Sequence, residues 1–148
     1  MRETMTGGCQ CGRVRYKVVV DDREAYLCHC RMCQRATGGV SVALKLVEVA
    51  DVEWTAAAPG RYRSSPFAQR GFCAACGTSL TYEGDDHHQL DLTVGSFDEA
   101  GVFVPVSHSG VESRHDAWLD TRGLPEQRTE ENARIAQKWI DSVGHLPS

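Results

Sequence analysis

The sequence predicts an all-β fold of antiparallel sheets, followed by one C-terminal α-helix. Three observations predict this fold class. Apolar residues alternate with polar ones in several short runs, cysteines gather in three tight clusters between those runs, and the C-terminal segment carries apolar residues at helical spacing. The 148 residues are enough to build one domain with a hydrophobic core.

The predicted strands begin directly after the first cysteine cluster. Period-two alternation is clearest in residues 13–18, 40–47 and 90–94, and shorter runs occur in residues 52–54, 60–63, 79–82 and 102–106. Such alternation is typical of half-buried antiparallel strands. Segments rich in Gly, Pro and Asp predict the turns between them, at residues 38–39, 59–60, 83–86 and 95–98.

One helix is predicted over residues 129–143, and a short helical turn is predicted near residues 30–35. In the longer segment Thr129 is the expected N-cap, and Gly144 is expected to end the helix. The apolar residues that share one face are Ala133, Ala136, Trp139, Ile140 and Val143. The chain therefore divides into a β domain, residues 1–126, and a helical extension packed on it, residues 127–148.

Charge and hydropathy exclude several functional classes. The net charge is -4 with no long run of either sign, which argues against nucleic acid as a partner. No apolar run approaches the ~18 residues of a membrane span. Residues 1–5 contain no apolar stretch, so we expect no secretory signal and a cytoplasmic location. No motif predicts the oligomeric state.

The seven cysteines carry the strongest functional signal. They form a C-x-C pair, a C-x-C-x-x-C trio and a C-x-x-C pair, at Cys9 and Cys11, at Cys28, Cys30 and Cys33, and at Cys73 and Cys76. An odd number in tight clusters argues against a disulfide framework and indicates metal binding. All-thiolate sites hold zinc or iron–sulfur clusters, and the absence of ferredoxin spacings favours zinc.

The residue after each cluster suggests how the sulfurs divide. Gly12 follows Cys11 and Gly77 follows Cys76, as a zinc knuckle requires for its tight turn, whereas the middle cluster lacks a following glycine. We therefore expect one closed four-ligand structural zinc site, formed by Cys9, Cys11, Cys73 and Cys76.

The middle cluster is left with three thiolates and an open fourth position. Three protein ligands with one vacancy are typical of a catalytic metal, so Cys28, Cys30 and Cys33 are the predicted catalytic and zinc-binding residues. The alternative is a second structural site, in which His108 or His115 supplies the fourth ligand.

Thiolate donation weakens the Lewis acidity of zinc, so this site is poorly suited to activating water. A soft site with one open position suits a thiolate from the substrate, which would complete a tetrahedral set of four sulfurs. A thiol that binds in place of the metal is the alternative. The site would then act as a thiol or metal carrier.

The cysteine motifs closely resemble the glutathione-dependent formaldehyde-activating enzyme family, whose domain is shared by centromere protein V. The resemblance covers roughly residues 6–126. It is carried by Gly7-Gly8-Cys9-x-Cys11-Gly12-x-Val14-Arg15-Tyr16, Cys28-His29-Cys30-x-x-Cys33 and Phe72-Cys73-x-x-Cys76-Gly77-Thr78-x-Leu80, with weaker matches at Gly95-Ser96-Phe97-Asp98, Pro105-Val106-Ser107-His108, Trp118-Leu119 and Leu124-Pro125.

The resemblance implies a β-tent fold with two zinc sites divided as above. It also implies carbon–sulfur lyase chemistry, with glutathione and its S-hydroxymethyl adduct with formaldehyde as substrates. A non-catalytic zinc-binding interaction or thiol-binding module is the alternative function, and a metal-free redox switch of the clustered thiols is a third.

Other candidate residues have weaker signals. Arg31 and Arg35 lie four residues apart beside the trio, where they either bind glutathione carboxylates or form a solvated face. Ser41 and Thr78 could donate to sulfur or to a carbonyl, but small polar residues in turns more often satisfy backbone groups, and a structural hydrogen bond is favoured over proton transfer for His108. Aromatic residues expected in the core are Tyr16 and Trp118.

Overall fold

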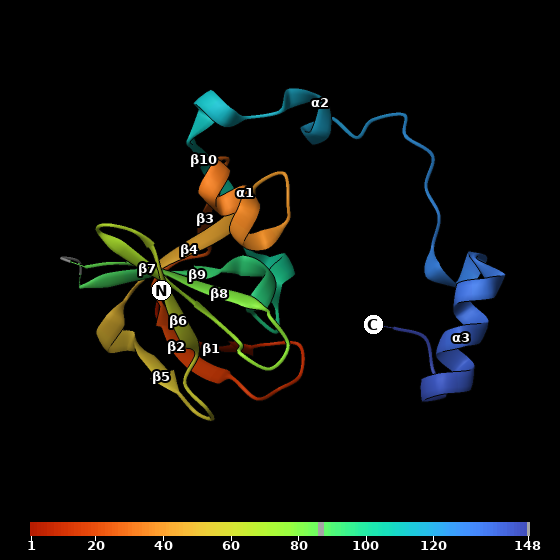
Figure 1. Cartoon of the computed structure of the whole chain (residues 1–148), viewed down its shortest axis with the longest axis horizontal. Helices are drawn as coiled ribbons and strands as arrows, with labels where there is room; N and C mark the ends of the chain where they lie inside the picture. The colour runs from red at the N-terminus through yellow and green to blue at the C-terminus, as the bar shows by residue number, and fades with distance from the viewer. Residues whose placement is uncertain (86–87, 148) are drawn as a thin grey trace. The chain divides into compact units, whose positions relative to one another are not determined.

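The computed structural model describes residues 1–85 and 88–147 and divides the chain into two units, Met1–His115 and Asp116–Ser148. The first unit contains every strand of the described chain, so the predicted mostly β fold class is confirmed (Figure 1). The boundary after residue 126 and the packing of the helix on the β domain stay predictions.

A small antiparallel sheet has the order β1-β2-β5. Its strands are β1 (Glu3–Gly8), β2 (Arg15–Val20) and β5 (Val52–Trp54). The alternation that predicts β2 is reproduced in its burial, because Tyr16, Val18 and Val20 are buried while Lys17 is exposed. One face of this sheet therefore belongs to the core.

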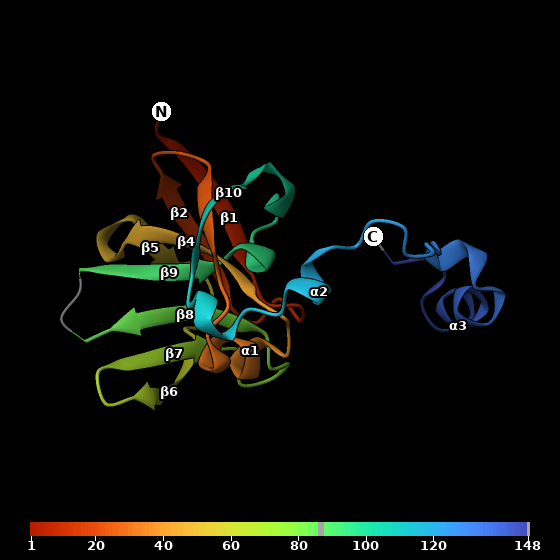
Figure 2. The same ribbon diagram turned by 90° about the horizontal axis from the view of Figure 1, so that it is seen from above.

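A larger sheet has the order β10-β3-β4-β9-β8-β7-β6. Figure 2 shows β9, β8, β7 and β6 side by side. The strands are β10 (Val104–Ser109), β3 (Glu24–Cys28), β4 (Val42–Glu48), β9 (Gln89–Thr93), β8 (Ser79–Gly84), β7 (Ala68–Phe72) and β6 (Gly60–Ser65).

The larger sheet is mixed, which differs from the purely antiparallel expectation. β10 pairs with β3 in parallel, and the other pairs are antiparallel. The chain leaves β9 through two 3₁₀ turns, η2 (Val94–Ser96) and η3 (Ala100–Val102), and this crossover brings β10 to the far edge of the sheet. Two parallel strands can be joined only through such a crossover connection. The turn residues in the sequence do not show that β10 pairs with β3 in parallel.

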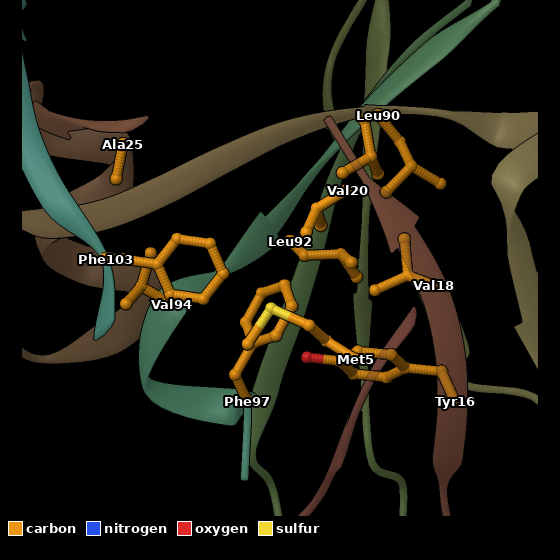
Figure 3. Packing of buried hydrophobic residues seen from close by; sticks show 11 residues of the cluster. Met5, Tyr16, Val18, Val20, Ala25, Leu90, Leu92, Val94, Phe97 and Phe103 are labelled. Carbon is orange, nitrogen blue, oxygen red and sulfur yellow. The ribbon is translucent and has the colours of Figure 1, made fainter. Parts of the chain in front are cut away.

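The core lies between the two sheets. Figure 3 shows Met5, Tyr16 and Val18 of the small sheet facing Leu92 of β9 and Phe97. The rings of Tyr16 and Phe97 pack edge to face, with centroids 5.6 Å apart, and the Tyr16 hydroxyl shares a 2.8 Å hydrogen bond with Ser96 Oγ. The burial of Tyr16 agrees with its predicted core position.

Two further 3₁₀ turns and one short helix complete the first unit: η1 (Val49–Asp51), η4 (Val111–Ser113) and α1 (Arg31–Thr37). The regular elements of the second unit are helical: α2 (Asp116–Leu119), η5 (Thr129–Glu131) and α3 (Ala133–Val143). Within the described residues, no helix combines the length and the apolar character that crossing a membrane requires.

The predicted C-terminal helix is shorter than expected at its start. Thr129 begins the 3₁₀ turn η5, and the N-cap of α3 is Asn132, whose side chain accepts a hydrogen bond from the Ile135 amide at 3.2 Å. Gly144 ends the helix in a left-handed conformation, as predicted. Trp118 is 56% exposed, so its predicted core position is wrong.

Candidate metal centres

The first and third cysteine clusters meet, although Cys73 lies 62 positions after Cys11 in the sequence. The sulfurs of Cys9, Cys11, Cys73 and Cys76 all lie within 4.8 Å of one another. The Sγ of Cys11 is 3.5 Å from that of Cys9 and 3.7 Å from that of Cys73. A tetrahedral zinc ion with Zn–S bonds of about 2.3 Å requires sulfurs about 3.8 Å apart, so this donor set fits zinc.

The glycines after these two clusters have the predicted conformation. Gly12 and Gly77 have φ values of 80° and 81°, a left-handed backbone that glycine adopts without strain. The turns direct polar groups at the sulfurs. The Val14 amide donates to Cys9 Sγ at 3.2 Å, and the Thr78 hydroxyl lies 3.2 Å from Cys76 Sγ.

The four-cysteine site joins the two sheets. Cys9 and Cys11 lie in the loop between β1 and β2 of the small sheet, while Cys73 and Cys76 lie in the turn between β7 and β8 of the large one. A metal ion held here would bind both hairpins, so its binding free energy would contribute to folding.

The middle cluster forms a second group of three sulfurs, which also lie within 4.8 Å of one another. Cys28 ends β3, Cys30 is the N-cap of α1 and Cys33 lies in its first turn, where the Cys33 amide donates to Cys30 Sγ at 3.3 Å. Among the described residues, no histidine joins this group, so the alternative with a histidine as fourth ligand is not realised. Three soft donors with no fourth protein ligand fit an open zinc site.

His29 and Gln34 hold the backbone around the trio. His29 is fully buried, its amide donates to the Ser109 carbonyl at 2.9 Å, and its Nε2 lies 2.8 Å from His108 Nδ1. The Gln34 side-chain amide, also buried, donates to the carbonyls of His29, Val40 and Ser113 at 2.8, 3.3 and 3.1 Å. These bonds fix the cysteine loop against α1 and the end of β10.

A buried guanidinium lies beside the trio. Arg70, in the middle of β7, is 3% exposed, and its Nη2 donates to Cys33 Sγ at 3.3 Å. Its guanidinium carbon lies 5.0 Å from the ring centroid of Tyr82, in cation–π contact. Burial disfavours the charged form of Arg70, but the hydrogen bond to Cys33 and the charge interactions with Cys33, Tyr62 and Cys30 together outweigh burial and raise the pKa of Arg70.

The thiols of each group have unequal pKa values. A hydrogen bond with Cys33, partly offset by burial, lowers the pKa of Cys28 to about 5, and the same contact raises the pKa of Cys33. Hydrogen bonds from the Thr78 hydroxyl and amide lower the pKa of Cys76 to about 5. The Arg13 amide lowers the pKa of Cys11, but the contacts with Cys9, Cys76 and Cys73 and the loss of hydration together outweigh it and raise that pKa to about 11. Each group therefore contains a thiol that ionises readily, which favours metal binding.

A cavity of about 500 Å³ lies between α1 and the knuckle that contains Cys76. Its lining includes Ala36 and Thr37 of α1, Ser41 and Val42 before and within β4, and Gly77 and Thr78 of the knuckle. Cys76 of the four-cysteine site lines this cavity directly, whereas the trio is connected to it through Val42, which packs in the buried cluster that contains Cys28 and Cys33. Its size falls within the usual range for small-molecule sites.

Comparison with known proteins agrees with this arrangement. A family model described as "Glutathione-dependent formaldehyde-activating enzyme" matches residues 4–113, which contain both cysteine groups. The chain belongs to the glutathione-dependent formaldehyde-activating enzyme family. The resemblance noted from the cysteine motifs is therefore confirmed.

Two individual proteins are similar to this member of the formaldehyde-activating family. A protein of Schizosaccharomyces pombe named as an uncharacterized lyase is 30% identical over 76 residues, which span 51% of this chain and 55% of that relative. A crystal structure of a Rhodobacter sphaeroides protein, at 20% identity, matches with a TM-score of 0.58 and covers 71% of this chain and all of that one. The second match shows a shared fold.

The structure places the residues that the sequence suggested as assisting the trio in this member of the family. Arg31 donates to Gln34 Oε1, His108 contacts His29, and Ser41 and Thr78 line the cavity. Arg35 lies exposed in the last turn of α1. Sequence reasoning missed Arg70 and Gln34. The sequence signal for Arg70 is weak, since it is a charged residue two positions before the Phe72-Cys73 pair, between Gln69 and Gly71.

Proposed function

We propose that this protein is a zinc-dependent carbon–sulfur lyase-type enzyme that acts on a small thiol and its aldehyde adduct, such as glutathione and S-hydroxymethylglutathione. The observation that carries the proposal is the trio of assembled thiols with no fourth protein ligand among the described residues. Family membership supports glutathione as the thiol and formaldehyde as the aldehyde. The clustered free thiols suit a reducing compartment, so we infer action in the cytoplasm.

In this proposal the two cysteine groups have different roles. Cys9, Cys11, Cys73 and Cys76 hold a structural zinc ion that links the sheets, and Cys28, Cys30 and Cys33 hold the reactive one. When bound at the trio, zinc supplies a soft Lewis acid that keeps a substrate sulfur in its nucleophilic thiolate form. The protein's own residues then position that sulfur and shield it from water.

The reaction forms or breaks one carbon–sulfur bond without a change of oxidation state. In the direction of synthesis, the thiol sulfur attacks the aldehyde carbon, and the thiol proton ends on the former carbonyl oxygen. The reverse reaction returns that proton to sulfur and releases the aldehyde. Val42 and Leu44 pack with Cys28 and Cys33 and keep the reacting sulfur in apolar surroundings.

The cavity beside α1 is the proposed site for the remainder of the thiol molecule. Val42 lines this cavity and packs with Cys28 and Cys33, and the cavity lining offers hydroxyl groups from Thr37, Ser41 and Thr78. Hydroxyl and backbone groups suit the amides and carboxylates of a tripeptide thiol. Arg35, exposed on the same helix, is the proposed partner of a terminal carboxylate.

Calorimetric titration with glutathione tests the proposal, using protein that carries two zinc ions per chain. We expect binding by the wild type and its loss in Cys30→Ser, because that variant lacks one of the three ligands. S-methylglutathione, which has no free thiol, is the matched control ligand and should not bind with comparable affinity. NMR exchange spectroscopy with ¹³C-formaldehyde then measures interconversion of free and thiol-bound formaldehyde.

The outcomes separate the enzyme from its alternatives. Thiol binding with accelerated exchange supports the lyase, and binding without acceleration indicates a thiol-binding module. If the wild type with both metals bound neither glutathione nor another small thiol, a non-catalytic zinc module would remain. Exchange at the uncatalysed rate in both the wild type and Cys30→Ser would contradict the catalytic role of the trio.

A further inference from the structure

Arg70 is a buried cation whose charge is not balanced by a carboxylate. Its side chain is 3% exposed, and within the described ranges no Asp or Glu oxygen lies within 4.0 Å of its guanidinium nitrogens. Its Nε is buried and has no hydrogen-bond partner among the residues described. Among the described residues, the ionisable side chain that accepts a hydrogen bond from Arg70 is Cys33, through its Sγ.

Burial of such a charge is unfavourable unless another charge compensates for it. An isolated cation loses its hydration when it moves into the interior, and buried arginines are normally paired with carboxylates for this reason. Lys45 follows this rule, because it is 6% exposed and forms an ion pair with Asp22. Arg70 departs from the rule, because the ionisable side chain to which it donates a hydrogen bond is Cys33 of the trio.

The trio presents the complementary problem. Cys28 is 9% and Cys33 2% exposed, so little of their charge is hydrated. Three thiolates on one Zn²⁺ ion leave one net negative charge, and a fourth thiolate from a substrate would leave two. In the four-cysteine site Cys11 and Cys76 are exposed, so water can solvate the excess negative charge there. The trio requires a counter-charge from the protein.

We propose that Arg70 is the counter-ion of the three-cysteine site, a positioning residue that acts through Cys33 to retain the metal and to admit a thiolate as fourth ligand. The guanidinium donates to Cys33 Sγ, and its stacking on Tyr82 keeps it in place without a carboxylate that would cancel its charge. Retention of the metal stands on the contacts of Arg70 alone. Admission of a thiolate rests on the proposed function.

Competition with a chelator measures how strongly Arg70 helps the three-cysteine site to retain its metal. Wild-type protein, Arg70→Met and Arg70→Lys are loaded with two zinc ions per chain and titrated with a chromophoric chelator. In Arg70→Met we expect the more weakly held zinc to bind at least tenfold more weakly, which is the loss expected for a hydrogen bond to a charged group. The more tightly held zinc should be unaffected. Arg70→Lys, which retains the charge, should stay within about threefold of the wild type.

Cobalt spectroscopy separates a direct effect on the trio from general destabilisation. The second equivalent of Co²⁺ enters the more open site, and its sulfur-to-cobalt charge-transfer band reports the electron density on the trio. Loss of the donor to Cys33 should shift this band to lower energy in Arg70→Met. Lys45→Met is the matched control, because it removes a cation of similar burial that pairs with Asp22, and it should leave the band and both affinities unchanged.

The outcomes are decisive for each part. Wild-type affinity and an unchanged band in folded Arg70→Met would overturn the proposal, and so would an equal effect of Lys45→Met. If Arg70→Met does not fold, Arg70→Lys decides: retention within threefold supports a counter-ion, and a tenfold loss contradicts it. For the second part, glutathione should bind metal-loaded Arg70→Met at least tenfold more weakly than the wild type. If glutathione fails to bind even the wild type, the proposed function fails while the metal measurements still decide the role of Arg70.

Discussion

Gly110 packs directly against Cys30. A Cβ atom at Gly110 would lie 2.8 Å from the Cys30 backbone nitrogen and 3.0 Å from its Cβ, and Gly110 has a φ of 64°. The residue follows β10, the edge strand whose parallel pairing with β3 brings Ser109 opposite Cys28. The crossover to β10 therefore brings a close backbone contact to the three-cysteine site.

We predict that Gly110→Ala perturbs this site selectively. The added methyl group must displace the Cys30 backbone, so zinc content should fall from two ions per chain towards one while the β-rich circular dichroism spectrum is retained. Gly123→Ala is the control, because Gly123 also has a positive φ, 77°, but no atom lies within 4 Å of its added Cβ. Elemental analysis of the purified variants checks this, and two retained ions in Gly110→Ala would contradict it.

Loss of a ligand should affect the two sites differently. Cys73→Ser removes a fully buried ligand of the site that joins both sheets, so we expect loss of cooperative unfolding or a chain that fails to fold. Cys30→Ser affects a site that is already open and should retain the fold with about one zinc ion per chain. Thermal unfolding monitored by circular dichroism measures the difference. Equal unfolding of both variants would refute the division into structural and open sites.

Gln34→Leu should destabilise the first unit without removing a metal ligand. The Gln34 amide is buried and donates to three backbone carbonyls, and the substitution removes all three hydrogen bonds. We expect the free energy of unfolding to fall by about 1–3 kcal/mol. Urea denaturation of zinc-loaded protein measures it. Gln137→Leu, on the exposed face of α3, should change stability by less than about 0.5 kcal/mol, and an equally small effect at Gln34 would contradict the prediction.

The Arg15–Asp98 pair predicts a pH dependence. Hydrogen bonds from Arg15 and then Thr6 lower the pKa of Asp98 from 3.8 to about 2. Because the folded-state pKa is the lower one, the stabilisation is complete above the unfolded value and disappears as the pH falls through about 2. The side chains of Arg15 and Asp98 are both more than about a third exposed. The contribution of this ion pair to the free energy of unfolding should therefore stay below about 1 kcal/mol.

NMR titration of the Asp98 carboxyl carbon measures this pKa directly. The carboxyl should remain ionised as the pH is lowered from neutral to about 3, whereas in Arg15→Gln its titration should move up towards 3.8. A wild-type midpoint near 3.8 would show that the ion pair does not form in solution. Asp120, whose pKa is lowered by its own partner Arg122, provides an internal control that the Arg15 substitution should not affect.

Alternation in the sequence predicts strand positions best where the exposed face of the strand is polar. β2 and β5 fall close to their predicted ranges because apolar and polar residues alternate in them. β7 is missed because its alternation contains Arg70, a charged residue that the fold buries. β9 was expected to be half-exposed, yet residues 90–93 are buried on both faces because the strand lies in the middle of the large sheet.

The division of the cysteines could be predicted because it depends on local chemistry. Gly12 and Gly77 follow their cysteines immediately, and the turn that each permits is visible in the sequence. The partners of the trio could not be predicted in this way. Arg70 lies 37 residues beyond Cys33, and His108 lies 79 beyond His29. Such contacts follow from the strand order of the large sheet, which a single sequence does not specify.

The two cysteine groups differ in how soon they can assemble during synthesis. Cys28 and Cys33 are separated by four residues, so the trio can gather around an ion as soon as this short stretch has left the ribosome. Cys11 must wait for Cys73, 62 positions later, and for the two sheets to approach each other. From sequence separation we therefore expect the three-cysteine group to assemble first, and the four-cysteine group to be completed only as the two sheets come together.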